Sequence, residues 1–242
     1  MKNYRVLALV GSRKGENSNT AKLCRQVIAT AQQQCGEDKI TAEILTSDQW
    51  GIHACLSCGT CFQQGYCPQD EQDGMRVIRE KLLLSDGILL ASPVYAAAVS
   101  GDMKQLIDRL SFWLHTMPLI GKTTVLLSTA DSNHGDSAIS YMRQLTEKMG
   151  AITAASHNVY VNVGNVRLTD EKSMQPLLAE IASQLYQGLR GKLQPSEEQK
   201  EYFALQQKRM QSLRTLWEEY GLPRSGEEAM WDRQGYFNES PW

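Results

Sequence analysis

The chain has 242 residues, of which 42% are apolar and 21% charged, the composition of an ordinary soluble globular protein. Lysine and arginine number 25 against 27 acidic residues, and the net charge of −2 offers no broad basic field for nucleic acid or an anionic membrane surface. No run approaches the roughly 20 apolar residues of a membrane span, and no secretory cleavage pattern follows the N-terminus, so we expect a cytoplasmic protein.

Apolar runs alternate with segments of helical period from the start of the chain to about residue 190. Strands are predicted at residues 4–10, 40–45, 87–91, 123–128 and 152–161. Helices are predicted at residues 19–34, 75–85, 103–115, 137–149 and 169–189. This alternation predicts a flavodoxin-like α/β fold, a doubly wound five-stranded parallel sheet of order 2-1-3-4-5 with helices on both faces.

The composition changes after about residue 191, where aromatic side chains become frequent. Pro195-Ser196-Glu197-Glu198 predicts the start of a helix, and Gly221-Leu222-Pro223 predicts its end. So many aromatic residues are not typical of a solvated tail, and we expect this part to pack on the domain, on a partner subunit or over a ligand. We therefore divide the chain into a domain of residues 1–191 and a helical C-terminal extension of residues 192–242.

A polar, glycine-containing loop, residues 11–20, directly follows the first predicted strand and leads into a helix. Such a turn directs free backbone N–H groups and the positive end of a helix dipole to one spot, here with the cations Arg13 and Lys14 nearby. The pattern favours a mononucleotide phosphate site, and it matches neither the P-loop nor the dinucleotide motif. The alternative is a polar loop in which Asn19 or Thr20 only caps the helix.

A second loop follows the third predicted strand and reads Ser92-Pro93-Val94-Tyr95, then small residues. Pro93 stiffens the exit from the strand, and the small residues would let a flat ligand lie close to the backbone. Strands one and three flank the point where the strand order reverses, so both loops would border one crevice. The alternative for Tyr95 is a buried core aromatic with a hydrogen-bonded hydroxyl group.

Four cysteines, Cys55, Cys58, Cys61 and Cys67, fall within thirteen residues after the second strand. In a reducing compartment such crowding indicates metal ligation or redox chemistry before disulfides. Four thiolates are the ligand set of a [4Fe-4S] cluster. A zinc site, four free thiols and a redox dithiol of Cys58 and Cys61 are the alternatives.

Other noticeable side chains have simpler interpretations. Cys24 and Cys35 are expected to pack on the first helix. Asp108 and Arg109 stand at a helix end and are expected to be structural. His53 precedes the cysteines and could act as a second layer around a cluster.

Three motifs in order resemble those of the flavodoxin-like NAD(P)H-dependent FMN reductase superfamily. They are Gly11-Ser12-Arg13 through Asn19-Thr20, Ser92-Pro93-Val94-Tyr95, and Lys104-Gln105-Leu106-Ile107-Asp108-Arg109. With the four cysteines added, the chain resembles the iron-sulfur flavoprotein branch of that superfamily, over about residues 4–190.

The resemblance implies an FMN site, residue by residue. The phosphate would meet Ser12, Arg13, Ser18, Asn19 and Thr20. The isoalloxazine would be flanked by Pro93, Val94, Tyr95 and Ala96. Its other side would be closed by Ser128, Thr129, Ala130, His134 and Gly135. The alternative for His134 is an exposed loop residue, and no side chain is assigned as a catalytic acid or base.

The resemblance also implies a function. We expect an FMN-dependent oxidoreductase or electron-transfer protein in which flavin two-electron chemistry is coupled to a [4Fe-4S] cluster, with NAD(P)H as a candidate donor. A cluster-free NAD(P)H-dependent FMN or quinone reductase and a flavin dehydrogenase of a small biosynthetic metabolite are the alternatives. A homodimer or homotetramer is expected, with a ferredoxin-like protein as a candidate redox partner. The extension would suit the subunit interface, or would form a lid over the flavin with Trp217, Trp231 or Tyr236.

Overall fold

The computed structural model describes residues 1–161 and 170–242 of the chain, so the predicted helix start at Thr169 lies outside the described residues. In this part of the chain, one parallel sheet contains the long strands β1 (Asn3–Val10), β2 (Lys39–Thr46), β3 (Gly87–Tyr95), β5 (Thr123–Ala130) and β6 (Ile152–Tyr160). The order across the sheet is β2-β1-β3-β5-β6, and the short strand β4 (Ala98–Val99) pairs antiparallel with β3. This order confirms the predicted order 2-1-3-4-5. The prediction counted only the five parallel strands, so its fourth and fifth strands are β5 and β6.

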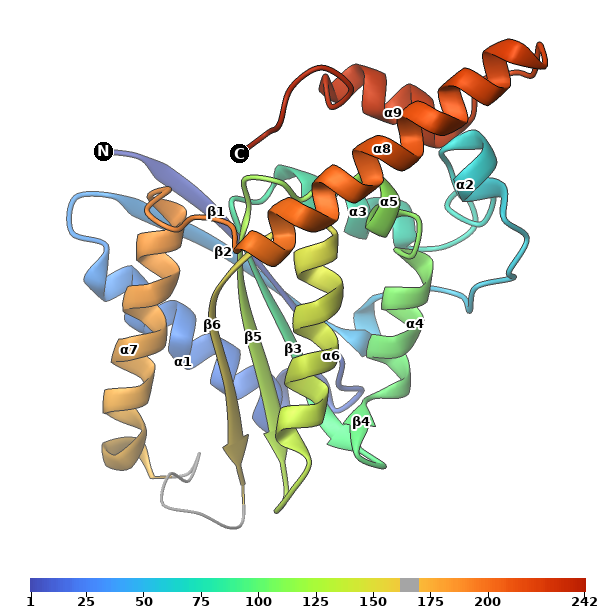
Figure 1. Cartoon of the computed structure of the whole chain (residues 1–242). Coiled ribbons are helices and arrows are strands. Elements are labelled where there is room, and N and C mark those ends of the chain that lie inside the picture. Colours follow the sequence, from blue (N-terminus) through green and yellow to red (C-terminus); the bar gives the residue numbers. More distant parts are fainter. Residues whose placement is uncertain (162–169) are drawn as a thin grey trace.

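Helices cover both faces of the sheet (Figure 1). One face carries α1 (Asn19–Gln34) and α7 (Glu171–Leu189). The other face carries α3 (Met75–Leu84), α4 (Gly101–Arg109) and α6 (Gly135–Lys148). Alternate side chains of β1 enter the two cores, Val6 and Ala8 on one side, Leu7 and Leu9 on the other. Because both faces are buried, the strands read as nearly continuous apolar runs.

The predicted helix over residues 103–115 is two helices. α4 ends at Arg109, and the four-residue helix α5 (Trp113–Thr116) follows a turn. Leu110, Phe112 and Trp113 are all buried in the same core, so the apolar spacing continues across the break and conceals it in the sequence.

The third strand is longer than predicted. β3 continues past Ala91 to Tyr95, and Pro93 pairs with Thr129 of β5. The pairing of β1 with β3 has already ended at Val10, so no partner on that side needs the N–H that proline lacks.

The C-terminal extension packs on the domain of its own chain. α8 (Glu197–Glu219) begins after Ser196, whose Oγ accepts a hydrogen bond from the N–H of Gln199 at 3.2 Å. The helix α9 (Gly226–Gln234) was not predicted. Trp231 of α9 stacks on Phe203 of α8 at 5.5 Å between ring centroids, and its Nε1 donates to the carbonyl oxygen of His115 at 2.8 Å. Extension and domain are therefore joined by an aromatic core of their own.

The alternative of a lid over the flavin loops of the same chain is wrong for two of its three side chains. Trp231 and Tyr236 are buried in the aromatic core between α8, α9 and the α5 region. In Figure 1 this core lies at the end of the molecule opposite the arrowheads of β3, β5 and β6. Both aromatic rings are thus already covered by their own chain.

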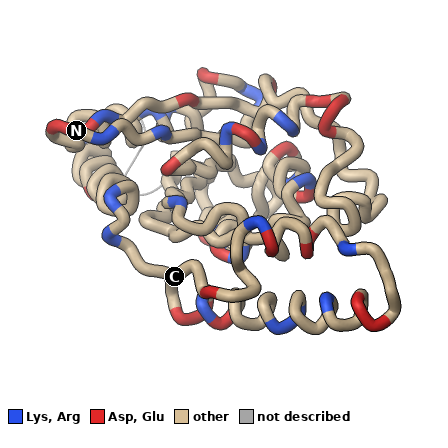
Figure 2. Tube along the Cα trace, turned by 90° about the horizontal axis from the view of Figure 1, so that it is seen from above, with Lys and Arg blue, Asp and Glu red and all other residues tan. Residues whose placement is uncertain are grey.

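Charged residues of both signs are interspersed along the trace, as Figure 2 shows. Many form local pairs, such as Arg214 and Arg224 with Asp232 of α9. Across the described ranges, no helix has the length and apolar character needed to cross a membrane.

We predict that Trp231→Ala lowers the free energy of unfolding by about 3–5 kcal/mol, because it removes a fully buried indole from the aromatic core. Urea unfolding measures this loss. Trp217→Ala, at the half-buried edge of the same core, is the matched control and should lose clearly less. Equal losses in the two variants would contradict the packing described here.

Candidate functional site

The loop after β1 is anchored at both ends. At its start, the N–H of Gly11 donates to the carbonyl oxygen of Ala91 on β3 at 2.8 Å. At its end, Ser18 caps α1 by accepting a hydrogen bond from the N–H of Ala21 at 3.1 Å. The other N–H groups of the first turn of α1 have no partner within the helix, as at any helix start. The loop therefore presents N–H donors and the helix dipole beside the carboxyl end of β1.

Arg13 is engaged by Asp102, on the first turn of α4. Its Nε lies 3.0 Å from both carboxylate oxygens, and its Nη2 lies 2.9 Å from Oδ1. Ser47 donates a further hydrogen bond to the same carboxylate at 2.9 Å. The hydrogen bond from Arg13 lowers the pKa of Asp102. Because the Arg13 side chain is still 79% exposed, this is a surface ion pair of the kind worth about 0–1 kcal/mol.

The start of α1 and the end of β5 meet through their hydroxyl groups. Thr20 Oγ1 and Thr129 Oγ1 are 2.6 Å apart, and both side chains are buried. Next to them, Ser128 Oγ lies 2.7 Å from Oδ1 of Asn158 and donates to the carbonyl oxygen of Gly135 at 3.2 Å. The fold thus brings two of the predicted flavin loops together.

The turn between β3 and β4 has a strained backbone. Ala96 and Ala97 have φ angles of +48° and +62°, a region that costs a residue with a Cβ about 1–2 kcal/mol. The turn is fixed at its base by Ser92, whose Oγ accepts the N–H of Ser100 at 2.9 Å. Tyr95 is 55% exposed, so the alternative of a core aromatic is wrong. Strain of this kind is concentrated at functional sites in proteins.

The remaining predicted flavin contacts differ in exposure. Buried among them are Ser12, Pro93 and Ala130. Half-buried or exposed are Asn19, Val94 and His134. His134 stands at the N-cap of α6 with a φ of +61°, and its side chain makes no capping hydrogen bond. After it, a Cβ at Gly135 would lie 1.8 Å from Cγ of Asn158, so this position requires glycine.

We call residues 50–74 the cysteine segment. It leaves the carboxyl end of β2 and follows α4 toward the last turn of that helix. Gln105 Nε2 donates to the carbonyl oxygen of Ile52 at 2.7 Å, and Arg109 Nη1 donates to that of His53 at 3.0 Å. Side chains of α4 therefore hold the start of a segment whose only helix is the five-residue α2 (Thr60–Gln64) in the described structure.

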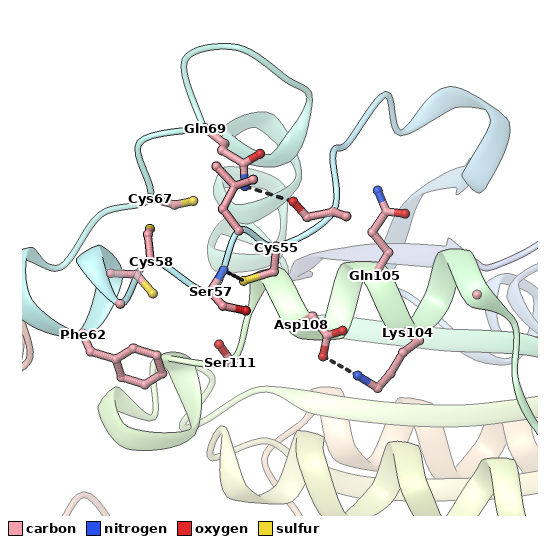
Figure 3. A pocket seen from close by; sticks show the side chains of 15 residues that line it. Cys55, Ser57, Cys58, Phe62, Cys67, Gln69, Lys104, Gln105, Asp108 and Ser111 are labelled. Carbon is pink, nitrogen blue, oxygen red and sulfur yellow. Dashed lines mark hydrogen bonds and ion pairs between the residues drawn. The ribbon is translucent and has the colours of Figure 1, made fainter.

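The four cysteines border a single hollow of about 630 Å³. Cys55 and Cys58 are exposed, whereas Cys61 and Cys67 are half-buried. Figure 3 shows Cys55, Cys58 and Cys67 around this hollow, with side chains of α4 forming another wall. The α4 side chains are Lys104, Gln105 and Asp108.

The thiols differ in how easily they ionise. The hydroxyl group of Thr60 donates to Cys58 Sγ at 3.3 Å, and this hydrogen bond lowers the pKa of Cys58. Burial raises the pKa of Cys61, and the neighbouring Cys67 and Cys55 raise it further. Four thiolates in one hollow would therefore repel one another unless positive charge stands nearby.

Two buried arginines lie near Cys67, and both are paired with aspartates. Arg109 is only 1% exposed, with Nη2 lying 2.9 Å from Oδ1 of Asp70 and Nη1 paired with Asp73. Arg79 pairs with Asp70 and donates through Nη2 to the carbonyl oxygen of Arg109 at 2.6 Å. Burial lowers the pKa of Arg79, whereas the nearby Cys67 acts to raise it. Both guanidinium groups thus stand within electrostatic reach of Cys67.

Sequence reasoning missed Arg79, Asp70 and Asp73. The available signal was a pair of aspartates three residues apart, the first of which stands three residues after the last cysteine. Charged residues at such spacing are most often solvated, so the pattern alone does not indicate a buried network.

The side chains that were expected to be structural lie both around the cysteine segment and in the core. The structural role of Arg109 is confirmed, but Asp108 pairs with Lys104. His53 contributes through its backbone, since its N–H donates to Asp73 at 2.9 Å while its ring is largely exposed. Cys24 and Cys35 are buried as predicted, and burial raises the pKa of Cys24 to about 12, which makes it an inert thiol.

No three histidine, cysteine or acidic side chains within residues 1–161 and 170–242 lie close enough together to ligate one metal ion. The cysteines surround a shared space without converging on a single point.

Comparison with known proteins gives consistent similarities. The sequence model of the NADPH-dependent FMN reductase family matches residues 4–165. An iron-sulfur flavoprotein of Archaeoglobus fulgidus is 31% identical over 189 residues, which cover 76% of this chain and 80% of that protein. Another, from Methanosarcina thermophila, is 31% identical over 106 residues, which cover 43% of this chain and about half of the relative, 51%.

Solved structures share the fold. RosB with the bound intermediate 8-demethyl-8-formylriboflavin-5′-phosphate gives a TM-score of 0.62 at 13% identity, covering 78% of this chain and 79% of that one. The apo form of an NADH:FMN oxidoreductase, EMOB, gives 0.50 at 19% identity, covering 81% and 93%. At such identities the likeness shows a common fold and nothing finer.

The buried ion pairs make stability depend on pH. Burial pushes the pKa of Asp73 upward, but hydrogen bonds from Arg109 and from two backbone N–H groups outweigh it and hold the pKa below its ordinary value of 3.8. A carboxyl group whose pKa is lower in the folded than in the unfolded state contributes its full stabilisation at pH values above its unfolded pKa. This stabilisation is lost as the pH falls through its folded pKa.

We predict that Asp73→Asn lowers the free energy of unfolding by about 3 kcal/mol at neutral pH, because it leaves the two buried guanidinium groups of Arg79 and Arg109 sharing the single carboxylate of Asp70. The difference in unfolding free energy from the wild type should begin to narrow as the pH falls below 3.8, where Asp73 of the unfolded chain takes up a proton, and it should close as the pH falls through the lowered pKa of folded Asp73. Urea unfolding over a series of pH values measures both effects. Asp108→Asn, which removes an exposed pair, is the control and should change little. A gap that stays constant down to strongly acidic pH contradicts the assignment.

Proposed function

The chain belongs to the NADPH-dependent FMN reductase family, and on that premise we propose that this flavin-dependent oxidoreductase binds FMN and one [4Fe-4S] cluster. The observation that carries the cluster proposal is the single hollow bordered by Cys55, Cys58, Cys61 and Cys67. FMN supplies two-electron chemistry and a cluster supplies one-electron transfer, so together they convert one into the other.

The phosphate of FMN belongs, in this proposal, at the loop after β1. Its contacts would be Ser12, Arg13, Ser18, Asn19 and Thr20. The support is physical, because helix N–H groups, hydroxyl groups and one guanidinium group suit a phosphate. Arg13 is held only by its surface pair with Asp102, and a phosphate that binds it through two hydrogen bonds can displace so weak a partner.

The isoalloxazine belongs at the neighbouring loops. One side would be formed by Pro93, Val94, Tyr95 and Ala96. The other would be formed by Ser128, Thr129, Ala130, His134 and Gly135. The exposed ring of Tyr95 and the contact between Thr20 and Thr129 support this placement, because they put an aromatic face and the phosphate loop near one crevice.

The donor set of the hollow suits a cluster better than a zinc ion. A tetrahedral zinc site holds four sulfur atoms about 3.8 Å apart, as follows from Zn–S bonds of about 2.3 Å. In the described parts of the chain the thiols are not drawn together in this way, and they border a space of about 630 Å³.

We further propose a homodimer or homotetramer, in which the cysteine hollow of one subunit faces the flavin of another. Within one chain, Arg13 of the phosphate loop contacts the first turn of α4, whereas the cysteine segment contacts the last turn through Arg109. These two turns are about 13 Å apart along the nine-residue helix, so the phosphate loop and the cysteine hollow of one subunit are separated. The exposed side chains of Leu56 and Tyr66 beside the cysteines give that surface an apolar rim, which suits a subunit contact. A ferredoxin-like protein is the alternative occupant of this surface.

A second candidate is an NAD(P)H-dependent FMN reductase without a cluster. It is favoured by the family model, which is named for that activity and matches most of the domain. In that case the four cysteines would be free thiols, and NAD(P)H would reduce the flavin of a protein without iron.

We predict that the protein binds FMN more tightly than riboflavin and that Arg13→Gln weakens FMN binding about tenfold, the effect of losing one charge-assisted contact of about 1.4 kcal/mol. Riboflavin binding should not change. Quenching of flavin fluorescence measures both. Lys22→Gln makes the same change of charge on the exposed face of α1 and should leave both affinities unchanged. Equal weakening of FMN and riboflavin would refute the phosphate contact.

We predict that Cys58→Ser abolishes iron binding while FMN stays bound, because the cluster loses one of four ligands and the flavin loops are untouched. The measurement is iron, sulfide, zinc and FMN per chain after anaerobic purification. Cys35→Ser, the same substitution at a buried packing cysteine, should keep wild-type iron. Full iron content in Cys58→Ser would overturn the ligand assignment, and zinc in place of iron in the wild type would overturn the cluster.

A further inference from the structure

We infer that the C-terminal helix α9 is a clamp that holds α2, and with it the cysteines, in position, so that the extension is a positioning element for the site. The role that we give the clamp, to position cluster ligands, rests on the proposed function. The contacts between α9 and α2 do not depend on a bound cluster. One direct contact between the extension and α2, and a second link that runs through His115 of the domain, carry the inference.

The first contact is a close approach of two backbones. Gly226 is the first residue of α9, and a Cβ placed there would lie 1.9 Å from the nitrogen of Gly65 and 2.1 Å from the carbonyl carbon of Gln64. Gly65 ends α2 with a φ of +77°, and its N–H donates to the carbonyl oxygen of Cys61 at 3.0 Å. Any side chain at residue 226 would therefore push directly on the turn that contains Cys61.

The second contact runs through side chains. The ring of Phe62, on α2, lies 5.2 Å from the ring of His115. His115 Nδ1 is in turn 2.6 Å from Oε1 of Glu227, which is almost completely buried on the first turn of α9. Trp231 of α9 holds the backbone of His115 as well. The side of α2 that carries Phe62 therefore packs against His115, and His115 is itself held by Glu227 and Trp231 of the extension.

α2 needs such support because it cannot be stable by itself. It has five residues, far fewer than an isolated helix requires, and no side chain caps either end. Upstream, α4 holds the backbone at Ile52 and His53, and downstream Asp70 pairs with the buried arginines. Cys58, Cys61 and Cys67 lie between these anchors, where Cys61 and Phe62 pack partly against the core of the domain and α9 supports α2 from the other side.

The relative placement of the thiols is therefore set from two sides. α4 and the arginine pairs fix the ends of the cysteine segment, and α9 fixes its middle. Displacing α9 from α2 should leave the flavin loops intact, because they lie at the strand ends. It should spread the thiols, with loss of the geometry that four ligands to one cluster require.

The test is Gly226→Ala in the full-length protein, with Gly221→Ala as the control. Gly221 lies in the same extension at a φ of +61°, with nothing within 4 Å of its Cβ position, so its replacement adds backbone strain without a clash. We expect Gly226→Ala to lose more than half of its iron, to expose the apo-protein thiols to faster labelling, and to speed amide exchange of residues 60–67 about tenfold. FMN content should match the wild type, and the control should match the wild type in every measurement.

A second variant covers the case in which Gly226→Ala does not fold. Glu227→Ala breaks the link to His115 and should speed the same thiol labelling and amide exchange, whereas Glu227→Gln keeps a hydrogen bond and should restore most of the protection. Wild-type labelling and exchange in both Gly226→Ala and Glu227→Ala would overturn the clamp. If the wild type contains no iron, the proposed cluster fails, and the labelling and exchange measurements still decide the clamp.

Discussion

The ion pairs of Arg109 are the interaction on which the site depends. This guanidinium group, on the last turn of α4, is 1% exposed and joins Asp70, Asp73 and the carbonyl oxygen of His53. The cysteine segment has little regular structure of its own, so its path is set by these fixed charges. Removing one member would leave a charge buried without a partner, which is among the most destabilising changes a protein can suffer. The same ion pairs stand beside Cys67, so they also fix the position of the last cysteine.

α4 connects the two halves of the proposed chemistry. Its first turn meets the loop after β1 through Asp102 and Arg13, and its last turn holds the cysteine segment through Arg109. One helix of nine residues therefore fixes the positions of both parts relative to each other. The C-terminal extension adds a contact from outside, so the cysteines lie between the α/β domain and a segment of 51 residues that follows it in sequence.

Much of the fold could be predicted from the sequence, because strands buried on both faces leave unbroken apolar runs and the alternation with helices allows few topologies. The strand order placed the loops after the first and third strands at one crevice, whereas the contact between Thr20 and Thr129 was not predicted. The break between α4 and α5 could not be predicted, since buried Leu110 and Phe112 continue the helical spacing through it. The network of Arg79 and Arg109 was also hidden, because it joins residues far apart in sequence and each looks like a surface charge alone. Contacts between segments far apart in the sequence decide such features, and local sequence patterns do not indicate these contacts.

The most direct test of the central claim is a reductive titration of the anaerobically purified, full-length protein, followed by the absorption of the flavin and of any cluster. Two electrons reduce FMN and one reduces a [4Fe-4S] cluster, so the account predicts three electrons per chain with both absorption changes present. An uptake of two electrons with flavin bleaching alone would contradict the cluster, and a colourless protein that takes up none would contradict the account as a whole.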